Sequence, residues 1–338
     1  MSPIFAAPIT SAMKKKNPLV SIFITVFLDL LGLGIVIPIA APLLLSVSEG
    51  MLPPTMPFST RSILLGLLLG IFSIAQFIGA PILGTLADKY GRKKLLLLSV
   101  TGTLVGYLLF AIGIVERNIV LCFVSRALDG FTGGNISIAM SAIADVSEEK
   151  DKARNFGLVG MSFGLGFILG PFLGGILADP HLVSWFNFST PYWFTSVLSV
   201  VNILVILTLF PETLHNRKDT HVSLTTGFRN FGKAFRDVRL RSIFGVLFLT
   251  VFGFNFFTQF FQVFLIQKFR YSVTDIAYLF GYIGLWLALT QGVLLRPLTK
   301  RFKPTPLVSA SVLLCAFAFP VLLLPSQSWW LYVIVPLI

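Results

Sequence analysis

The chain has 338 residues, of which 55% are hydrophobic and only 12% are charged. A soluble domain carries about 25% charged residues, so this composition excludes an ordinary soluble fold and indicates a membrane protein. The net charge of +12 does not indicate a nucleic-acid partner, because the bases lie in short links between long apolar stretches.

Nine apolar stretches are long enough to cross a bilayer, which takes about 20 residues. A tenth apolar run begins near Ser328 and continues to Ile338. We therefore expect an all-α membrane protein with nine complete helices and part of a tenth. The complete spans are expected at 18–47, 61–87, 94–115, 118–145, 153–178, 190–210, 241–267, 274–298 and 305–325.

Most of the 26 lysines and arginines fall in alternate links between these spans, beginning with Lys14 to Lys16. Because lysine and arginine are enriched in cytoplasmic links, this pattern predicts a cytoplasmic N-terminus in a multi-pass protein of the cell (inner) membrane. The apolar run after Lys16 is too long for a cleaved signal peptide and contains Asp29, so it is interpreted as the first membrane helix.

Asp29 is the first residue along the chain that points to a function. It lies in the middle of the first span, where an acid costs about 3 kcal/mol and is usually functional. Proton coupling requires a carboxyl group that can switch between charged and neutral; an acid held structurally by polar neighbours is the alternative. The stretch from Phe27 to Pro38 resembles the first helix of proton-coupled drug exporters.

The link between the second and third spans holds one acid, two glycines and four bases. It reads Gly84-Thr-Leu-Ala-Asp88-Lys-Tyr-Gly91-Arg92-Lys-Lys94. This pattern resembles the signature loop of the major facilitator superfamily of secondary transporters. The resemblance implies a bundle of twelve helices in two six-helix halves that transports by alternating access, of which this sequence contains the first nine and part of the tenth.

The fourth span contains Arg126 and Asp129, which share a helix face at i and i+3 and can pair. A purely structural ion pair is the alternative. The segment resembles the fourth-helix motif of the superfamily, with Asp129 in place of the usual glutamine. We expect Arg126 and Asp129 to take part in proton coupling together with Asp29.

The family pattern also implies a cytoplasmic latch that stabilises the outward-facing state. Carried over to this sequence, Arg92 pairs with Asp145 at the end of the fourth span, and Asp88 faces the eleventh helix. The residues assigned to the latch by resemblance are Gly84, Asp88, Gly91, Arg92 and Asp145.

The fifth span carries small residues at four-residue spacing, which let helix backbones approach closely. We expect its face at Gly166, Gly170 and Gly174 to cross the eighth span at Gly281, Gly284, Ala288 and Gly292, between the two halves. The segment resembles the antiporter motif of drug/proton exporters, and the region from Arg126 to Gly175 is most similar to the tetracycline/proton antiporters. The motif residues are Gly160, Gly164, Gly166, Gly170, Pro171, Gly174 and Gly175.

The long link before the seventh span and that span itself carry two further patterns. In the link, Phe228, Phe231 and Phe235 recur at helical spacing among basic residues, which favours an amphipathic helix on the cytoplasmic face over a plain linker. In the seventh span, amide side chains lie among phenylalanines and suit either an amphiphilic ligand or interhelical hydrogen bonds. The candidates for lining a substrate site are Asn255, Gln259 and Gln262.

An internal repeat supports the two halves. Gly84, Asp88 and Arg92 recur as Gly292, Arg296 and Lys300, in the second copy without the acid. The expected organisation is a six-helix half at 1–214, a cytoplasmic linker at 215–240 and an incomplete C-terminal half at 241–338.

The leading hypothesis for function is a proton-coupled exporter of a small amphiphilic compound, multidrug or tetracycline-like. It needs protons and a bilayer, no cofactor and no metal, and it is expected to be a monomer. An enzyme is not expected, because no cluster of nucleophiles, metal ligands or paired acids is present, and Cys122 and Cys315 lie in apolar stretches. The alternatives are an uptake transporter for a sugar or metabolite and a truncated remnant that does not transport.

Overall fold

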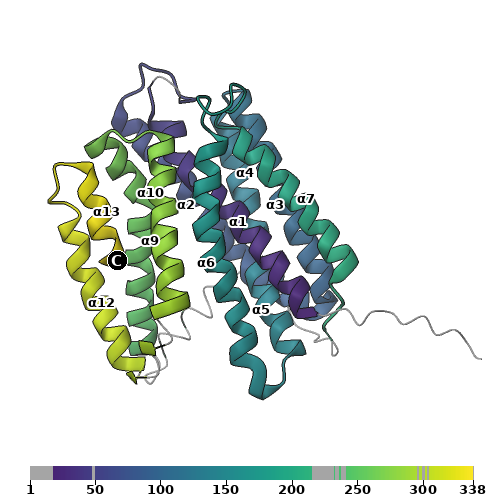
Figure 1. Ribbon diagram of the computed structural model, residues 1–338. Coiled ribbons are helices and arrows are strands. Elements are labelled where there is room, and N and C mark those ends of the chain that lie inside the picture. Colours follow the sequence, from purple (N-terminus) through teal and green to yellow (C-terminus); the bar gives the residue numbers. More distant parts are fainter. Residues whose placement is uncertain are drawn as a thin grey trace, which may run out of the picture.

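A computed structural model of the chain describes residues 18–47, 50–214, 232, 236, 241–294, 297–298, 301–302 and 304–337 (Figure 1). These residues form helices and their connections without a strand, so the expected all-α fold is confirmed. In the described part of the chain, six helices are long and apolar enough to cross a membrane. They are α1 (Pro18–Leu45), α2 (Phe58–Tyr90), α3 (Arg92–Val115), α6 (Lys152–Leu177, preceded by the 3-10 turn η1, Glu149–Asp151), α7 (Thr190–Leu209) and α9 (Arg241–Phe269).

The fourth expected span is not one helix. It is divided into α4 (Ile119–Thr132) and α5 (Asn135–Val146) at Gly133 and Gly134. Glycine costs about 1 kcal/mol relative to alanine inside a helix, and two in succession favour a helix end. The backbone is nevertheless satisfied, because Gln76 on α2 donates a hydrogen bond to the free carbonyl of Gly133 at 3.1 Å.

The remaining helices belong to the C-terminal part of the chain. They are α10 (Val273–Leu289), the π-helical turn η2 (Thr290–Leu294), α12 (Pro304–Val321), η3 (Ser328–Trp330), α13 (Leu331–Ile334) and η4 (Val335–Leu337). In the eighth expected span, 274–298, the α-helix α10 ends at Leu289 and the chain continues as η2.

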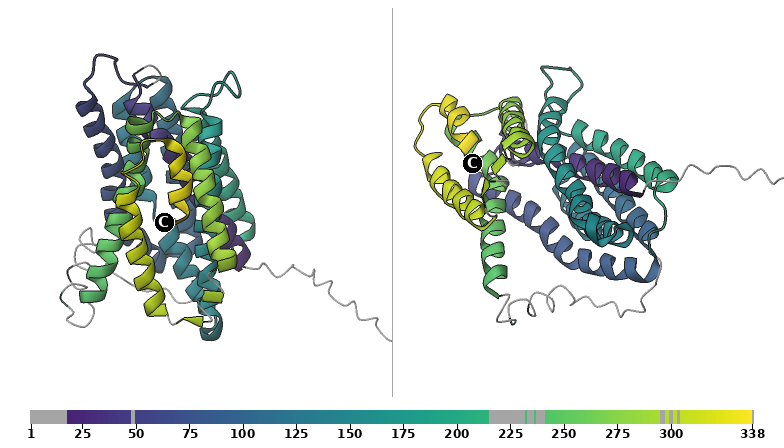
Figure 2. Two further views of the ribbon diagram at one scale, coloured as in Figure 1. Left: turned by 60° about the vertical axis from the view of Figure 1, so that its left-hand side comes forward. Right: turned by 60° about the horizontal axis from the view of Figure 1, so that its bottom comes forward.

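Helices α1 to α7 pack into one bundle, in which α1 lies against α6 and α7 while α3 lies against α4 and α7 (Figure 2). Two apolar clusters fill it, one around Leu43, Phe110 and Tyr192 and the other around Ile22 and Ala142. In the C-terminal part, a third cluster joins α9, α10 and α13. The first half of α9 exposes mainly apolar side chains, including Phe248, Leu249 and Phe252, which suits a lipid environment.

The bundle has two ends, which we name by their charge. The basic end carries the start of α1, the turn between α2 and α3, and the segment after α7; the opposite end carries the links α1–α2, α6–α7 and α9–α10 (Figure 1). At the basic end, Gly91 joins α2 to α3 with φ of 111°, a conformation that favours glycine.

Arg61 lies at the opposite end and is 1% exposed. Its guanidinium donates to four backbone carbonyls, those of Leu44, Ser46, Pro53 and Met56, at 2.7 to 3.3 Å. A buried charge is tolerated when it is fully hydrogen-bonded. Arg61 therefore ties the end of α1 and the following link to the start of α2.

Three expectations concern segments that the structure describes only in part. The amphipathic helix at Phe228, Phe231 and Phe235 lies outside the described residues, as do Arg296 and Lys300 of the second repeat copy. The division into halves at 1–214, 215–240 and 241–338 stays a prediction.

Candidate functional site

Asp29 meets an amide in the middle of the N-terminal bundle. It is half-buried on α1, and Asn135 Nδ2 donates a hydrogen bond to its Oδ1 at 2.6 Å. Asn135 is the first residue of α5, directly after the two glycines that end α4. Its own Oδ1 is buried without a hydrogen-bond partner among the described residues. Asn135 was not singled out from the sequence; the signal was a polar residue directly after Gly133-Gly134.

Arg126 and Asp129 form the expected pair, with Arg126 Nη1 at 3.5 Å from Asp129 Oδ2. Both are buried, at 8% and 3% exposed. Asp129 lies against α3, where it also hydrogen-bonds to Thr103. Arg126 has no hydrogen bond or ion pair to Asp29 among the described contacts, so the direct polar partner of Asp29 is Asn135.

Aromatic rings surround the guanidinium of Arg126. Its Cζ is 4.9 Å from the ring centroid of Phe110 and within 6 Å of those of Phe72 and Tyr192. Rings at this distance attract a cation through their quadrupole. Nε and Nη2 of Arg126 are buried without hydrogen-bond partners in the described part of the protein. Arg126 therefore retains unused donors beside the carboxylate of Asp129.

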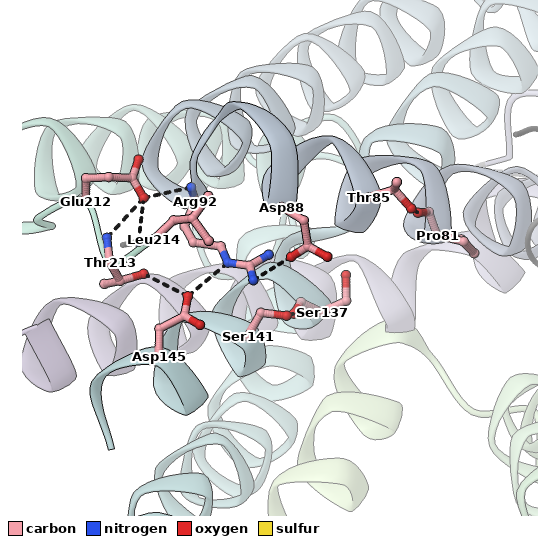
Figure 3. Close-up of polar contacts among 10 residues, drawn as sticks. All are labelled: Pro81, Thr85, Asp88, Arg92, Ser137, Ser141, Asp145, Glu212, Thr213 and Leu214. Atoms are coloured by element: carbon pink, nitrogen blue, oxygen red, sulfur yellow. Dashed lines mark hydrogen bonds and ion pairs between the residues drawn. The ribbon is translucent and has the colours of Figure 1, made fainter. Parts of the chain in front are cut away.

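The basic end holds a compact polar cluster around Arg92 (Figure 3). Arg92 Nη2 lies 2.5 Å from Asp88 Oδ1, and Arg92 Nε lies 3.1 Å from Asp145 Oδ2. The ion pair expected between Arg92 and Asp145 is thus present. Asp88 lies one helical turn before Arg92, and a Cβ added at Gly84 would touch only the Ser137 hydroxyl, at 4.0 Å. Whether the cluster acts as a latch stays a prediction.

Glu212, which the sequence analysis did not single out, completes this cluster. Its carboxylate accepts hydrogen bonds from the backbone nitrogens of Arg92 at 2.9 Å and Lys93 at 3.3 Å. These are free N–H groups of the first turn of α3, where an anion is favoured. A Cβ at Gly91 would collide with the same carboxylate. The signal was an acid after a proline, at the end of the bundle that carries the signature loop.

The glycine face of α6 packs against α1, which corrects the expected contact. A Cβ added at Gly170 would lie 2.5 Å from Gly34 Cα, and additions at Gly166 and Gly174 would collide with α1 as well. The prediction that this face meets the eighth span between the halves is wrong. The glycines of α6 meet Gly34 on α1, which lets the two backbones approach closely.

Helix α6 does contact α10, through a neighbouring face. A Cβ at Gly175 would collide with Ala277, and one at Gly284 would lie 2.7 Å from Ile168 Cα. Within α6, Pro171 packs near Gly34, Gly164 is buried, and Gly160 has open space around it. The side chain of Ala288 and the surroundings of Gly292 lie outside the description.

The amides of α9 do not form one wall. Gln262 is 2% exposed, and its Nε2 donates to the Ile37 carbonyl on α1 at 2.8 Å. Asn255 is exposed and bonds to Val251 of its own helix. The side chain of Gln259 is outside the description. Gln262 therefore makes an interhelical hydrogen bond, which was the alternative to a role in binding an amphiphilic ligand.

An apolar hollow of about 400 Å³ lies between α9 and α12. Phenylalanines dominate its walls, including Phe257, Phe261 and Phe319. It contains none of the polar residues that were expected to line a substrate site.

An all-helical bundle with an ionisable residue inside a membrane helix and a charged turn between two spans is typical of polytopic membrane transporters. The family model of the Major Facilitator Superfamily matches residues 3–338. The chain belongs to the Major Facilitator Superfamily.

Several relatives are resistance proteins. The chain is 29% identical over 330 residues to the class C tetracycline resistance protein of Escherichia coli, covering 96% of this chain and 78% of that protein. It is 36% identical over 199 residues to the class H tetracycline resistance protein of Pasteurella multocida, covering 59% of this chain and 45% of that one. It is also 28% identical over 305 residues to multidrug resistance protein 1 of Bacillus subtilis (strain 168), covering 89% and 72%.

Solved structures agree in fold. The crystal structure of the human organic anion transporter MFSD10 (TETRAN) matches with a TM-score of 0.65 at 25% identity, over 95% of this chain and 84% of that chain. A D-xylose-proton symporter matches with a TM-score of 0.65 at 15% identity, over 95% and 79%, and shows the fold alone.

Proposed function

We propose that this member of the superfamily is a proton-coupled secondary transporter that exports a small amphiphilic compound of the tetracycline or multidrug type by alternating access. The identities to tetracycline and multidrug resistance proteins support this substrate class. The proposal places the protein in the cell membrane with its basic end in the cytoplasm, as a monomer driven by the proton gradient without a cofactor.

The bond between Asp29 and Asn135 is the observation that carries the proposal. An amide partner orients the carboxylate without neutralising it, and no cation pairs with Asp29 among the described residues. Its negative charge inside the membrane is then neutralised by a proton or compensated by a positively charged substrate. Because both occupants compensate the same charge, they exclude each other, and this competition is what exchange requires.

The other polar groups support this exchange. Arg126 and Asp129 form a buried pair in the same bundle, and breaking such a pair leaves an uncompensated charge. The cluster of Asp88, Arg92 and Asp145 holds the ends of α2, α3 and α5 together. These helices then move as one body when access alternates.

Transport in proteoliposomes tests the proposal. The full chain is reconstituted, a pH gradient is imposed, and the movement of a panel of dyes and tetracyclines is followed with and without an ionophore. We expect gradient-driven transport in the parent and its loss in Asp29→Asn, which keeps the shape and removes the charge. In Asp29→Asn, binding of a neutral substrate, measured by fluorescence quenching, should survive, whereas a cationic substrate loses its counter-charge and should bind more weakly.

Glu149→Gln is the matched control, because Glu149 is an exposed acid in the turn η1 and pairs with Lys152 at the very start of α6. It should transport like the parent. Transport that follows the gradient equally well in Asp29→Asn would show that Asp29 is not the proton carrier, and Asp129 would be tested next. A parent that moves none of the panel, or moves it independently of the gradient, would contradict the proposed function.

A further inference from the structure

The N-terminal bundle meets the C-terminal helices at the end opposite to the basic end (Figure 2). There α6 approaches α10 so closely that a Cβ at Gly175 would collide with Ala277. Nearby, Gln262 on α9 donates its hydrogen bond to Ile37 on α1. At the basic end, by contrast, every described contact of Arg92 stays within the N-terminal bundle.

Asp179 stands at this junction, two residues after the end of α6, and is 8% exposed. One carboxylate oxygen, Oδ1, accepts a hydrogen bond from the backbone nitrogen of His181 at 2.8 Å. The other, Oδ2, accepts a hydrogen bond from the hydroxyl of Thr274 in the first turn of α10. The first bond orients the side chain on its own loop, and the second crosses to the C-terminal helices.

The surroundings favour the charged form of this carboxylate. The hydrogen bond from Thr274, and with it the backbone and charge of His181, hold the pKa of Asp179 below its ordinary range. Asp275, the acid on the same turn of α10, is engaged in a capping box with Ser272 of its own helix. The link from α9 contributes the charge of Arg270, which precedes this turn. An anion at the first turn of a helix is favoured by the helix dipole.

We propose that the bond between Asp179 and Thr274 is a latch that holds the N-terminal and C-terminal helices together at the end opposite to the basic end, and that this latch opens when the transporter changes its access. The opening of the latch rests on the proposed function, whereas the closed latch concerns the protein without substrate. The latch is independent of the Arg92 cluster, because the two lie at opposite ends of the bundle and share no residue.

A distance measurement between spin labels tests the latch without any substrate. Labels are placed at Ser184→Cys and Ser326→Cys, two exposed positions in links on either side of the junction, in a Cys122→Ala, Cys315→Ala background. Double electron–electron resonance on the full chain in lipid nanodiscs then gives the populations of short and long distances between the two labels. The parent should populate mainly the short distance.

Thr274→Val removes the hydroxyl and keeps the shape of the side chain, and Asp179→Ala removes the acceptor. Each should raise the ratio of long to short distances about three- to tenfold, the range for losing one charge-assisted bond near the surface. The double variant should resemble either single variant, because both remove the same bond. Thr274→Ser keeps the hydroxyl and should match the parent, which separates the bond from a general effect of substitution.

Asp275→Ala is the matched control, since it breaks a capping bond in the same turn without touching the other side of the junction. It should leave the distances unchanged. Parent-like distances in both Thr274→Val and Asp179→Ala would overturn the latch, and so would an equal shift in Asp275→Ala. A variant that fails to insert is recognised by its thermal unfolding and is replaced by Asp179→Asn, which keeps a neutral acceptor and should shift the ratio less than Asp179→Ala does.

Because no substrate is present, these results are separable from the proposed function. If the variants shift the distances as expected but the protein transports none of the compounds tested, the bond between Asp179 and Thr274 still holds the helices together. The proposed export of that class of compound is then rejected. Unchanged distances in a protein that transports would reject the latch alone.

Discussion

The carboxylate of Glu212 accepts a hydrogen bond at 2.9 Å from the backbone nitrogen of Arg92, which lies 120 positions earlier in the chain. The same residue whose side chain binds Asp88 and Asp145 thus has its main chain held from the end of α7. The turn between α2 and α3 is thereby held through both the side chain and the main chain of Arg92. One carboxylate joins the sixth expected span to the most charged turn of the bundle.

Replacing Glu212 should therefore loosen the whole basic end. Glu212→Ala leaves the first N–H groups of α3 without their acceptor, and the loss of such a cap costs about 1 to 2 kcal/mol. Thermal unfolding in detergent should show a lower midpoint. Glu148→Ala is the control, because Glu148 is exposed and pairs with the exposed Lys150. Equal midpoints for the two variants would contradict the capping role.

A second prediction concerns the seam between α1 and α6. Gly170→Ala places a methyl group 2.5 Å from Gly34 Cα, so the two backbones must separate. Overpacking of this kind costs about 1 to 3 kcal/mol, and transport should fall with it. Gly160→Ala is the control on the same helix, where the added methyl meets open space. Gly170→Leu should abolish transport without preventing insertion; normal transport by that variant would contradict the prediction.

Arg61 gives a third prediction. Arg61→Lys keeps the charge but has no planar fork with which to reach four carbonyls, so buried acceptors lose their donors. We expect a loss of stability of about 2 to 4 kcal/mol, because each unsatisfied buried group costs 1 to 3 kcal/mol. Arg117→Lys is the matched control, an exposed arginine at the same end of the bundle. A midpoint for Arg61→Lys equal to that of Arg117→Lys would show that the guanidinium is dispensable.

The pH dependence of the junction follows from Asp179. Its pKa is lowered by Thr274 and His181 in the closed state, so its stabilising effect is complete above the ordinary pKa of a free aspartate, about 3.9. As the pH falls through the lower pKa of the closed state, this effect is lost. The difference in closed population between the parent and Asp179→Ala should thus be constant from pH 8 to pH 5 and shrink below about pH 4.

Spin-label distances at a series of pH values measure that difference. His181→Gln is the control, because its backbone nitrogen still donates to Asp179 while the ionisable imidazole is gone. A midpoint between pH 6 and pH 7 that disappears in His181→Gln would assign the pH response to the histidine and contradict the prediction.

Helices and nearby charged pairs could be predicted from the periodicity and charge of the sequence. Contacts with a partner far along the chain could not. Six of the nine expected spans, the pair of Arg126 with Asp129 and the contact of Arg92 with Asp145 were anticipated from pattern or resemblance. Four-residue spacing correctly places Gly166, Gly170 and Gly174 on one face of α6. Spacing cannot say which neighbour that face meets, and the neighbour is α1.

Two polar residues show most clearly that a sequence does not reveal long-range contact partners. Glu212 follows the sixth expected span and was not singled out, since its hydrogen bonds go to a turn far away in the sequence. Arg61 was not singled out either, although its side chain is buried by a loop that wraps around it. In both cases the partners are backbone atoms, which have no residue-specific signature in a sequence.

The interruption of the fourth span has a mechanical consequence. Two helices joined through a pair of glycines can change their mutual angle at small cost, whereas a continuous helix would have to break hydrogen bonds to bend. Asn135, which holds Asp29, is the first residue beyond that joint. The rest of α5 is anchored, because Arg92 pairs with Asp145 near its end and Ile138, Ala139 and Ala142 are buried in the bundle. The freedom that the glycines give is therefore confined to the start of α5, where a local rotation would turn the amide of Asn135 away from Asp29 while the cluster around Arg92 stays intact.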